Sequence, residues 1–221
     1  MVAIFDAISE PIARRVTGGL VRIGLVLKSR AWKGAGSAGV TPTQGQALSM
    51  LREAPEGLHL SALAKLLGIS APTASDMVNS LVAKGLARKE SGTDKRSITL
   101  KLTPDGEAVA ARTMEWPDFL GSAVEALAPA EQAAFLRMLV KLIRTLQING
   151  DIPLQRMCIT CRHFRPNAHE GPNPHHCAFV DAPFGDRHLR LNCAEQEEAD
   201  DETKDANWQR FVARDAIIAA S

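Results

Sequence analysis

The spacing of apolar residues changes within one short stretch of the chain, and this change constrains the fold more than any other feature. Apolar residues follow a helical spacing over residues 60–67 and again over residues 70–84, with Gly68 between the two segments. From Leu86 to Thr103 the spacing becomes two, around a polar tip. The sequence therefore predicts two short helices joined by a glycine turn and followed directly by a β-hairpin.

Longer helical patterns flank this core. A helix is predicted from Ile8 to about Ser29, ended by the glycine-rich run 33–39, and a capping-box sequence at Thr41 opens another that reaches about Glu53. Two more are predicted over residues 103–127 and 129–148, and the apolar stripe of the latter is predicted to be a packing face: Phe135, Met138, Leu139, Leu142, Ile143 and Leu146. The predicted fold class is mainly α with a small β-hairpin wing, and a small irregular module follows it.

The second short helix and the hairpin carry polar and basic side chains suited to duplex DNA. The major groove of DNA accepts an α-helix, and short polar side chains can reach base edges or phosphates from it. Lysine and arginine on a hairpin can neutralise phosphates or enter a narrow minor groove. The candidate DNA-binding residues are Thr73, Ser75, Asn79 and Ser80 on the helix, and Arg88, Lys89, Lys95 and Arg96 on the hairpin.

Charge and composition agree with a folded nucleic-acid-binding protein. Residues 1–106 contain 14 Lys and Arg against 8 Asp and Glu, whereas residues 107–221 contain 12 against 17. No stretch approaches the roughly 20 apolar residues needed to span a bilayer, and the N-terminus lacks the order of a secretory signal. The expected location is the cytoplasm, with no membrane partner.

The spaced elements of residues 8–148 resemble the MarR family. The resemblance is carried by the run Leu60–Ser70, by Gly85-Leu86, by the wing sequence Asp94-Lys95-Arg96-Ser97 and by Thr103-Pro104-Asp105-Gly106. It implies a winged helix-turn-helix repressor that is a homodimer through its first and last helices and binds a near-palindromic operator. It also implies that Ser70, Thr73, Ser75 and Asn79 lie at the recognition helix, that Arg96 is at the wing tip, and that Asp94 orients Arg96.

Four cysteines within 36 residues form a second feature, with the spacing Cys158-x2-Cys161-x15-Cys177-x15-Cys193. In a reducing compartment such a cluster indicates metal binding or redox chemistry more than disulfides. A break at Asn149–Pro153 separates two predicted domains, 1–150 and 151–221. The second domain ends with an acidic linker, residues 195–202, and a last short helix.

Two groups satisfy four thiolates, a structural Zn2+ and an iron–sulfur cluster. Zinc ribbons usually present two Cys-x2-Cys pairs and this chain has one, so the spacing favours the cluster. The segment also resembles the small subunits of glycyl-radical decarboxylases, which implies a [4Fe-4S] cluster held by all four cysteines. One of His175 and His176 is an alternative ligand, and four nearby arginines are candidates to offset the charge of the site: Arg162, Arg165, Arg187 and Arg190.

The function predicted from these features is a DNA-binding repressor whose cluster senses redox state, oxygen or iron. The alternative is a MarR-like regulator with a structural zinc site, in which a small aromatic ligand is the effector. An electron-transfer module is a third reading. The chain is not expected to be an enzyme, because it shows no nucleophile–base pair, phosphate loop or His-Glu-x-x-His helix.

Overall fold

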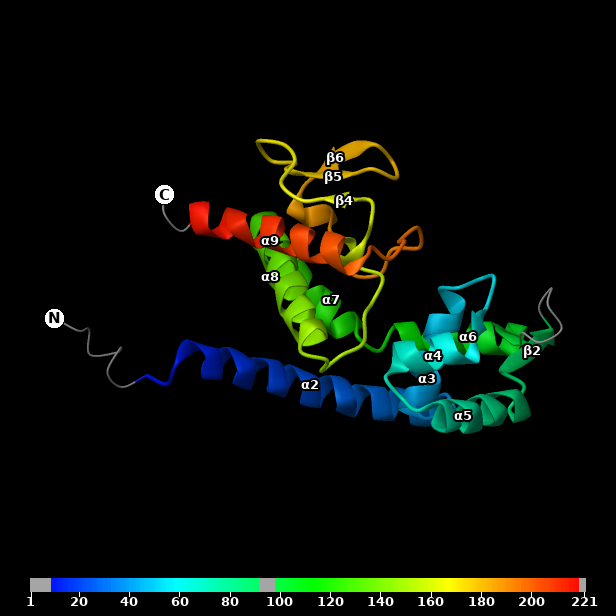
Figure 1. Ribbon diagram of the computed structural model, residues 1–221. Coiled ribbons are helices and arrows are strands. Elements are labelled where there is room, and N and C mark those ends of the chain that lie inside the picture. The colour runs from blue at the N-terminus through cyan, green and yellow to red at the C-terminus, as the bar shows by residue number, and fades with distance from the viewer. Residues whose placement is uncertain (1–8, 92–97, 219–221) are drawn as a thin grey trace. The chain divides into compact units, whose positions relative to one another are not determined.

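Two units make up the chain in the computed structural model, which describes residues 9–91 and 98–218 (Figure 1). The first unit comprises residues 1–122 and the second residues 123–221, so the division lies earlier than the predicted boundary at residue 150. The reason is that helix α8 (Pro129–Ile148) shares an apolar core with the cysteine segment. Three predicted wing residues, Asp94, Lys95 and Arg96, lie outside the described residues.

The first unit consists of helices and one three-stranded sheet. Its elements are α2 (Ile12–Ser37), α3 (Pro42–Arg52), β1 (Leu58–His59), α4 (Leu60–Leu67), α5 (Ala71–Ala83), β2 (Ala87–Ser91), β3 (Ile98–Leu102) and α6 (Pro104–Met114). A short helix, α7 (Asp118–Glu125), follows them. The strands are antiparallel in the order β1-β3-β2, and both Leu58 and Lys89 lie opposite Leu100. Two short helices followed by a hairpin confirm the predicted winged helix-turn-helix, to which β1 adds a third strand.

The first unit has one apolar core beneath the helix-turn-helix. Predicted apolar positions of α5 are buried, as are residues of α3, α4, β3 and α6 that pack against them. They include Leu48, Leu63, Val78, Leu81, Leu100 and Val109. Val82, expected on the same side of α5, is instead 37% exposed. The core therefore holds α5 by one face and leaves the opposite face free.

The Trp116 ring packs closely against both α2 and α3. The glycine-rich run 33–39 was expected to end this helix, but α2 continues to Ser37. A Cβ on Gly34 or on Gly45 would overlap the Trp116 ring, so the two glycines let α2 and α3 approach the indole. Gly34 of this run thus serves close packing within the helix.

The helix predicted over residues 103–127 is two helices, α6 and α7. Pro117 lies between them, and it has no N–H to donate and clashes with the preceding turn of a helix. Thr103 begins α6, since its hydroxyl accepts a hydrogen bond from Gly106 N at 3.0 Å. The sequence Thr103-Pro104 therefore marks a helix start, as expected.

Helix α2 leaves large apolar side chains uncovered on more than one side within its own unit. The exposed residues are Ile12, Val16, Leu20, Val21, Ile23, Leu25, Val26 and Trp32. No helix within the described ranges is both long and apolar enough to cross a lipid bilayer. Exposed apolar side chains in such number are of the kind that marks an interaction surface.

The second unit contains α8 and a small β-rich module followed by a helix. Its elements after α8 are η1 (Cys158–Thr160), β4 (Phe164–Arg165), β5 (His175–Cys177), β6 (Ala182–Phe184), η2 (Asp186–His188) and α9 (Asp201–Ile218). The strands form an antiparallel sheet in the order β4-β5-β6. The segment expected to be irregular therefore has a sheet of its own.

The core of the second unit joins this module to both helices. Its buried members come from α8, from the cysteine segment and from α9: Val140, Met157, Ile159, Cys161, Phe164, Leu189 and Phe211. The acidic stretch 195–202, predicted to be a linker, includes the start of α9. Asp200 caps that helix by accepting a hydrogen bond from Thr203 N at 2.7 Å, which lowers the pKa of its carboxyl.

The buried face of α8 differs from the predicted one. It carries Arg137, Val140 and Arg144, whereas Met138 and Leu142 of the predicted apolar stripe are 58% and 41% exposed. Arg137 can be buried because its guanidinium pairs with Asp186, donates to Phe211 O and lies 4.0 Å from the centre of the Phe211 ring. Charged residues thus share the contact face with Val140, Leu136 and Ile143, which pack in or against the same core, whereas Met138 and Leu142 remain outside it.

Gly106 provides a test of the packing of α6 on the wing. A Cβ at this position would overlap the carbonyl oxygen of Leu86, a backbone atom that cannot turn aside. Gly106→Ala is expected to lower the free energy of unfolding by about 1–3 kcal/mol, the usual cost of overpacking. Gly121→Ala is the matched control, because its new Cβ meets nothing within 4 Å and alanine favours a helix. Urea denaturation measures both, and equal stability of the two variants would contradict this packing.

Candidate functional site

Ser70 begins helix α5 as its N-cap. Its hydroxyl accepts a hydrogen bond from Thr73 N at 3.3 Å and lies 2.8 Å from the Thr73 hydroxyl. These contacts satisfy a backbone donor at the helix end, which accounts for a serine at this position without a DNA contact. Ser70 is therefore placed at the start of α5 with a structural role.

The free face of α5 is polar, as the helical spacing predicts. Thr73, Asp76 and Asn79 are exposed and Ser75 is partly exposed, whereas the opposite side of the helix is buried. Thr73, Ser75 and Asn79 are residues predicted to contact DNA. These side chains together form the candidate recognition face.

Ser80 lies away from this face. Its hydroxyl accepts a hydrogen bond from Gln44 Nε2 at 3.0 Å, and Lys84 Nζ donates to Gln44 Oε1 at 2.9 Å. Ser80 is therefore turned toward α3 and serves to fasten the two helices. The sequence assigned Ser80 to DNA because its position around the helix is close to that of the exposed residues.

The wing strand β2 presents its two basic residues on opposite faces. Lys89 Nζ donates to Asn79 Oδ1 at 2.7 Å, which joins the wing to the recognition face. Arg88 pairs with Glu90 at 2.8 Å on the other face, where Lys101 also contacts Glu90 at 3.4 Å. The hydrogen bond from Arg88 lowers the pKa of Glu90. Of the described wing cations predicted from the sequence, Lys89 adjoins α5 and Arg88 does not.

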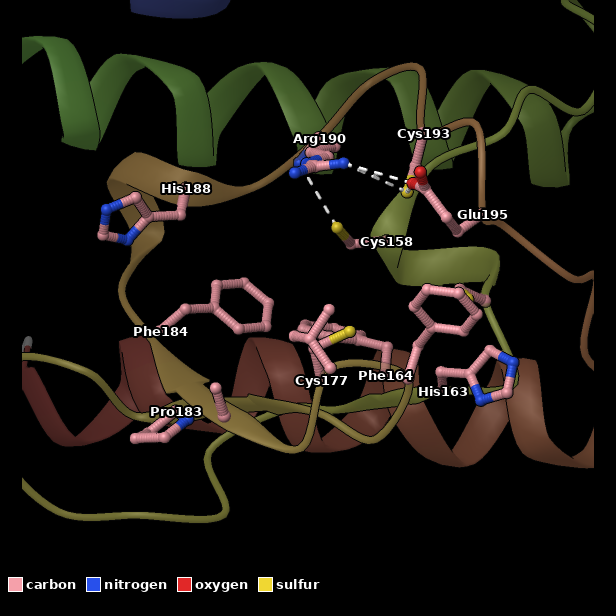
Figure 2. Close-up of a pocket in the computed structure, with 14 residues that line it drawn as sticks. Cys158, His163, Phe164, Cys177, Pro183, Phe184, His188, Arg190, Cys193 and Glu195 are labelled. Atoms are coloured by element: carbon pink, nitrogen blue, oxygen red, sulfur yellow. Dashed lines mark hydrogen bonds and ion pairs between the residues drawn. The ribbon is translucent and has the colours of Figure 1, made fainter.

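All four cysteines line one cavity of about 270 Å³ in the second unit (Figure 2). Cys158 begins η1 and Cys161 follows it, Cys177 ends β5, and Cys193 lies in the loop after η2. All four are free thiols, and Cys161 is buried. The structure therefore brings the whole predicted ligand set to one place.

The cavity has apolar and polar walls. Phe164, Phe179, Val180 and Phe184 form much of the apolar lining, and Phe179 and Val180 are more than half exposed at the rim. Arg190, Glu195, His163 and His188 complete the lining. The sulfurs thus face a mostly apolar space beside one arginine and one glutamate.

The thiols lie close enough to influence one another. Burial, together with the nearness of the other three cysteines, raises the pKa of the Cys158 thiol to about 11. Arg190 N acts in the opposite direction by donating a hydrogen bond to Cys158 Sγ at 3.3 Å. Cys158 is therefore a neutral thiol at pH 7, and binding to a metal would release its proton.

The two histidines predicted as alternative ligands do not line the cavity. His175 is fully buried; its Nδ1 accepts from Asn167 N at 3.2 Å and its Nε2 donates to Asp186 at 2.8 Å. His176 Nε2 lies 3.2 Å from Asp181. Although burial acts to raise it, the hydrogen bond from His175 and the charge of Arg137 lower the pKa of Asp186. His175 thus completes the anchor that Asp186 makes with α8.

Comparison with known proteins gives matches for the first part of the chain. Residues 38–97 match the model of the MarR family. The S. aureus MepR–DNA complex is 24% identical, with a TM-score of 0.52, over 59% of this chain and 97% of that chain. A MarR family transcription regulator is 23% identical, with a TM-score of 0.53, over 63% of this chain and 91% of that chain. A MepR mutant from a multidrug-resistant S. aureus isolate is 24% identical, with a TM-score of 0.50, over 60% of this chain and 97% of that chain.

These matches define what is shared and where it ends. They share the winged helix-turn-helix fold with the first unit, and the matched family consists of transcription regulators, in agreement with the expectation of a non-enzymatic protein. No curated protein sequence matches the chain. The family match ends before the cysteine segment, so the resemblance of that segment to glycyl-radical enzyme subunits stays a prediction.

Proposed function

We propose that this chain, which has the winged helix-turn-helix fold of the MarR family over about 60% of its length, is a DNA-binding transcription regulator that acts as a repressor. The contact between Asn79 and Lys89 carries the proposal, because it sets a wing cation beside the free polar face of α5. A helix of this kind fits the major groove while the cation neutralises phosphate. The S. aureus MepR structure bound to DNA, of the same fold, supports this reading.

The regulator is proposed to be a homodimer. The exposed apolar side chains of α2, and the exposed Met138 and Leu142 of α8, are surfaces that a second copy would cover. Two copies related by a two-fold axis would read a near-palindromic operator with half-sites about one DNA turn apart.

The four cysteines are proposed to hold a [4Fe-4S] cluster. The preference for a cluster over a single zinc rests on the spacing of the ligands, one Cys-x2-Cys pair followed by two single cysteines. Four sulfurs around a cavity suit a cluster, because its irons keep the ligands several ångströms apart. A bound cluster would supply one-electron chemistry and sensitivity to oxygen or iron. The apolar walls would limit access of water to it.

The path from this site to the DNA-binding elements is proposed to begin at α8. Asp186 and His175 belong to the same β-rich module as Cys177, and Arg137 of α8 binds Asp186 at 2.9 Å. Loss of the cluster would loosen this module and thereby change its hold on α8. If α8 belongs to the dimer interface, as the MarR resemblance implies, the spacing of the two recognition helices would change.

A second candidate keeps DNA binding and replaces the cluster signal by a small aromatic effector, with structural zinc at the cysteines. The observation that favours it is a cavity of about 820 Å³ in the first unit, whose lining includes Trp32, Met50, Leu66 and Trp116. Its size and aromatic lining suit a small organic ligand.

DNA binding is tested with two lysines on opposite faces of the wing. Lys89→Ala is expected to weaken binding to a duplex of the chain's own promoter and to lower the salt slope by about one, as for a lost phosphate contact. Lys101→Ala, on the face of Arg88, is the control and should change neither quantity. Thr73→Ala and Asn79→Ala should each cost about 1–3 kcal/mol if they read bases. Equal effects of the two lysine variants would contradict the assignment of faces.

The cluster is tested by composition. Anaerobically purified protein should be brown and contain about four irons and four sulfides per chain. Cys158→Ser and Cys177→Ser should lose the colour and the iron, whereas His176→Ala should keep both, because His176 lies outside the cavity lining. Colourless protein with one zinc per chain would contradict the cluster and favour the second candidate.

A further inference from the structure

The four arginines predicted to offset the charge of the site have different partners in the structure. Arg162 donates to Glu197, Arg165 to the carbonyls of residues 162 and 164, and Arg187 to Asn173. Within residues 9–91 and 98–218, Arg190 is the arginine whose hydrogen bonds reach cysteine sulfur. The four arginines are therefore not equivalent.

Arg190 contacts two sulfurs from widely separated parts of the segment. Its backbone N donates to Cys158 Sγ at 3.3 Å, and its Nη1 approaches Cys193 Sγ at 3.6 Å (Figure 2). The same Nη1 pairs with Glu195 at 3.4 Å, and Cys193 Sγ donates to Glu195 at 3.3 Å. One cation and one anion thus meet at the sulfur of Cys193.

We propose that Arg190 and Glu195 set the reduction potential of the cluster in opposite directions. This inference rests on the proposed [4Fe-4S] site. Hydrogen bonds to the ligating sulfurs and the net charge nearby are among the factors that determine cluster potentials. Arg190 supplies hydrogen bonds to the sulfurs and a positive charge, and Glu195 supplies a negative charge.

The sign of each effect follows from electrostatics. Reduction adds one negative charge to the cluster, so the Arg190 guanidinium stabilises the reduced state and raises the potential. The Glu195 carboxylate beside Cys193 destabilises the reduced state and lowers the potential. Both side chains are partly exposed, Arg190 at 61% and Glu195 at 44%, so water and salt weaken these effects.

The test measures the midpoint potential of anaerobic protein by a dye-mediated titration followed in the visible spectrum. Arg190→Gln should lower the potential by up to a tenfold change in the equilibrium constant for reduction, which is 59 mV for one electron. Glu195→Gln should raise it, and Arg190→Lys should fall between the wild type and Arg190→Gln. Arg187→Gln is the matched control, since Arg187 binds Asn173 and no sulfur, and should not move the potential.

The outcomes separate this inference from the proposed cofactor. Full iron content with unchanged potentials, or with shifts of the same sign in Arg190→Gln and Glu195→Gln, overturns the roles of Arg190 and Glu195 alone. Wild-type protein without iron overturns both the cluster and this inference. If Arg190→Gln holds no iron, the midpoint potential of Glu195→Gln is the test. A Glu195→Gln potential that is not higher than that of the wild type overturns the proposal.

Discussion

The apolar core shared by the cysteine segment, α8 and α9 is the constraint on which the geometry of the second unit depends. Ile159 lies between Cys158 and Cys161 in sequence, and both Ile159 and Phe211 of α9 are fully buried. Burying these residues fixes η1, and with it the first two cysteines, against the two helices. A segment with few apolar residues is ordered here because helices on both sides of it in the chain supply the rest of its core.

A buried polar cluster fixes the orientation of the β-rich module on α8. Arg137, Asp186 and His175 join α8, η2 and β5, and the carbonyl of Phe211 takes a further hydrogen bond from Arg137. Removing one partner from a buried pair of this kind leaves a charge without compensation, so the anchor specifies one arrangement of the module on α8. The positions of Cys177 and Cys193 follow, because they flank the segment that contains Asp186.

The elements of the first unit could be predicted because their signals are local. The spacing of apolar residues, the Thr41 capping box and Gly68 with φ of 65° each act within a few residues. The face of Ser80 could not be read in this way, since it depends on Gln44 of α3, which reaches Ser80 only through tertiary packing. The apolar stripe of α8 predicts the contact face only in part: Ile143 packs against the core, whereas Arg137 is buried through its tertiary contacts with Asp186 and Phe211. The acidic run predicts a linker at Glu195, whereas its carboxylate accepts a hydrogen bond from Cys193 Sγ, a contact that composition does not indicate.

The DNA-binding elements and the cysteine site act as one regulator if the state of the cysteine site changes the affinity for DNA. The most direct measurement is the affinity for a promoter duplex at fixed salt, with cluster-loaded protein and the same protein after anaerobic removal of the cluster. Coupling between two sites typically changes affinity about 5- to 150-fold, and a change of at least fivefold is expected here. Identical affinities of the two forms would contradict the role of the cysteines in regulation.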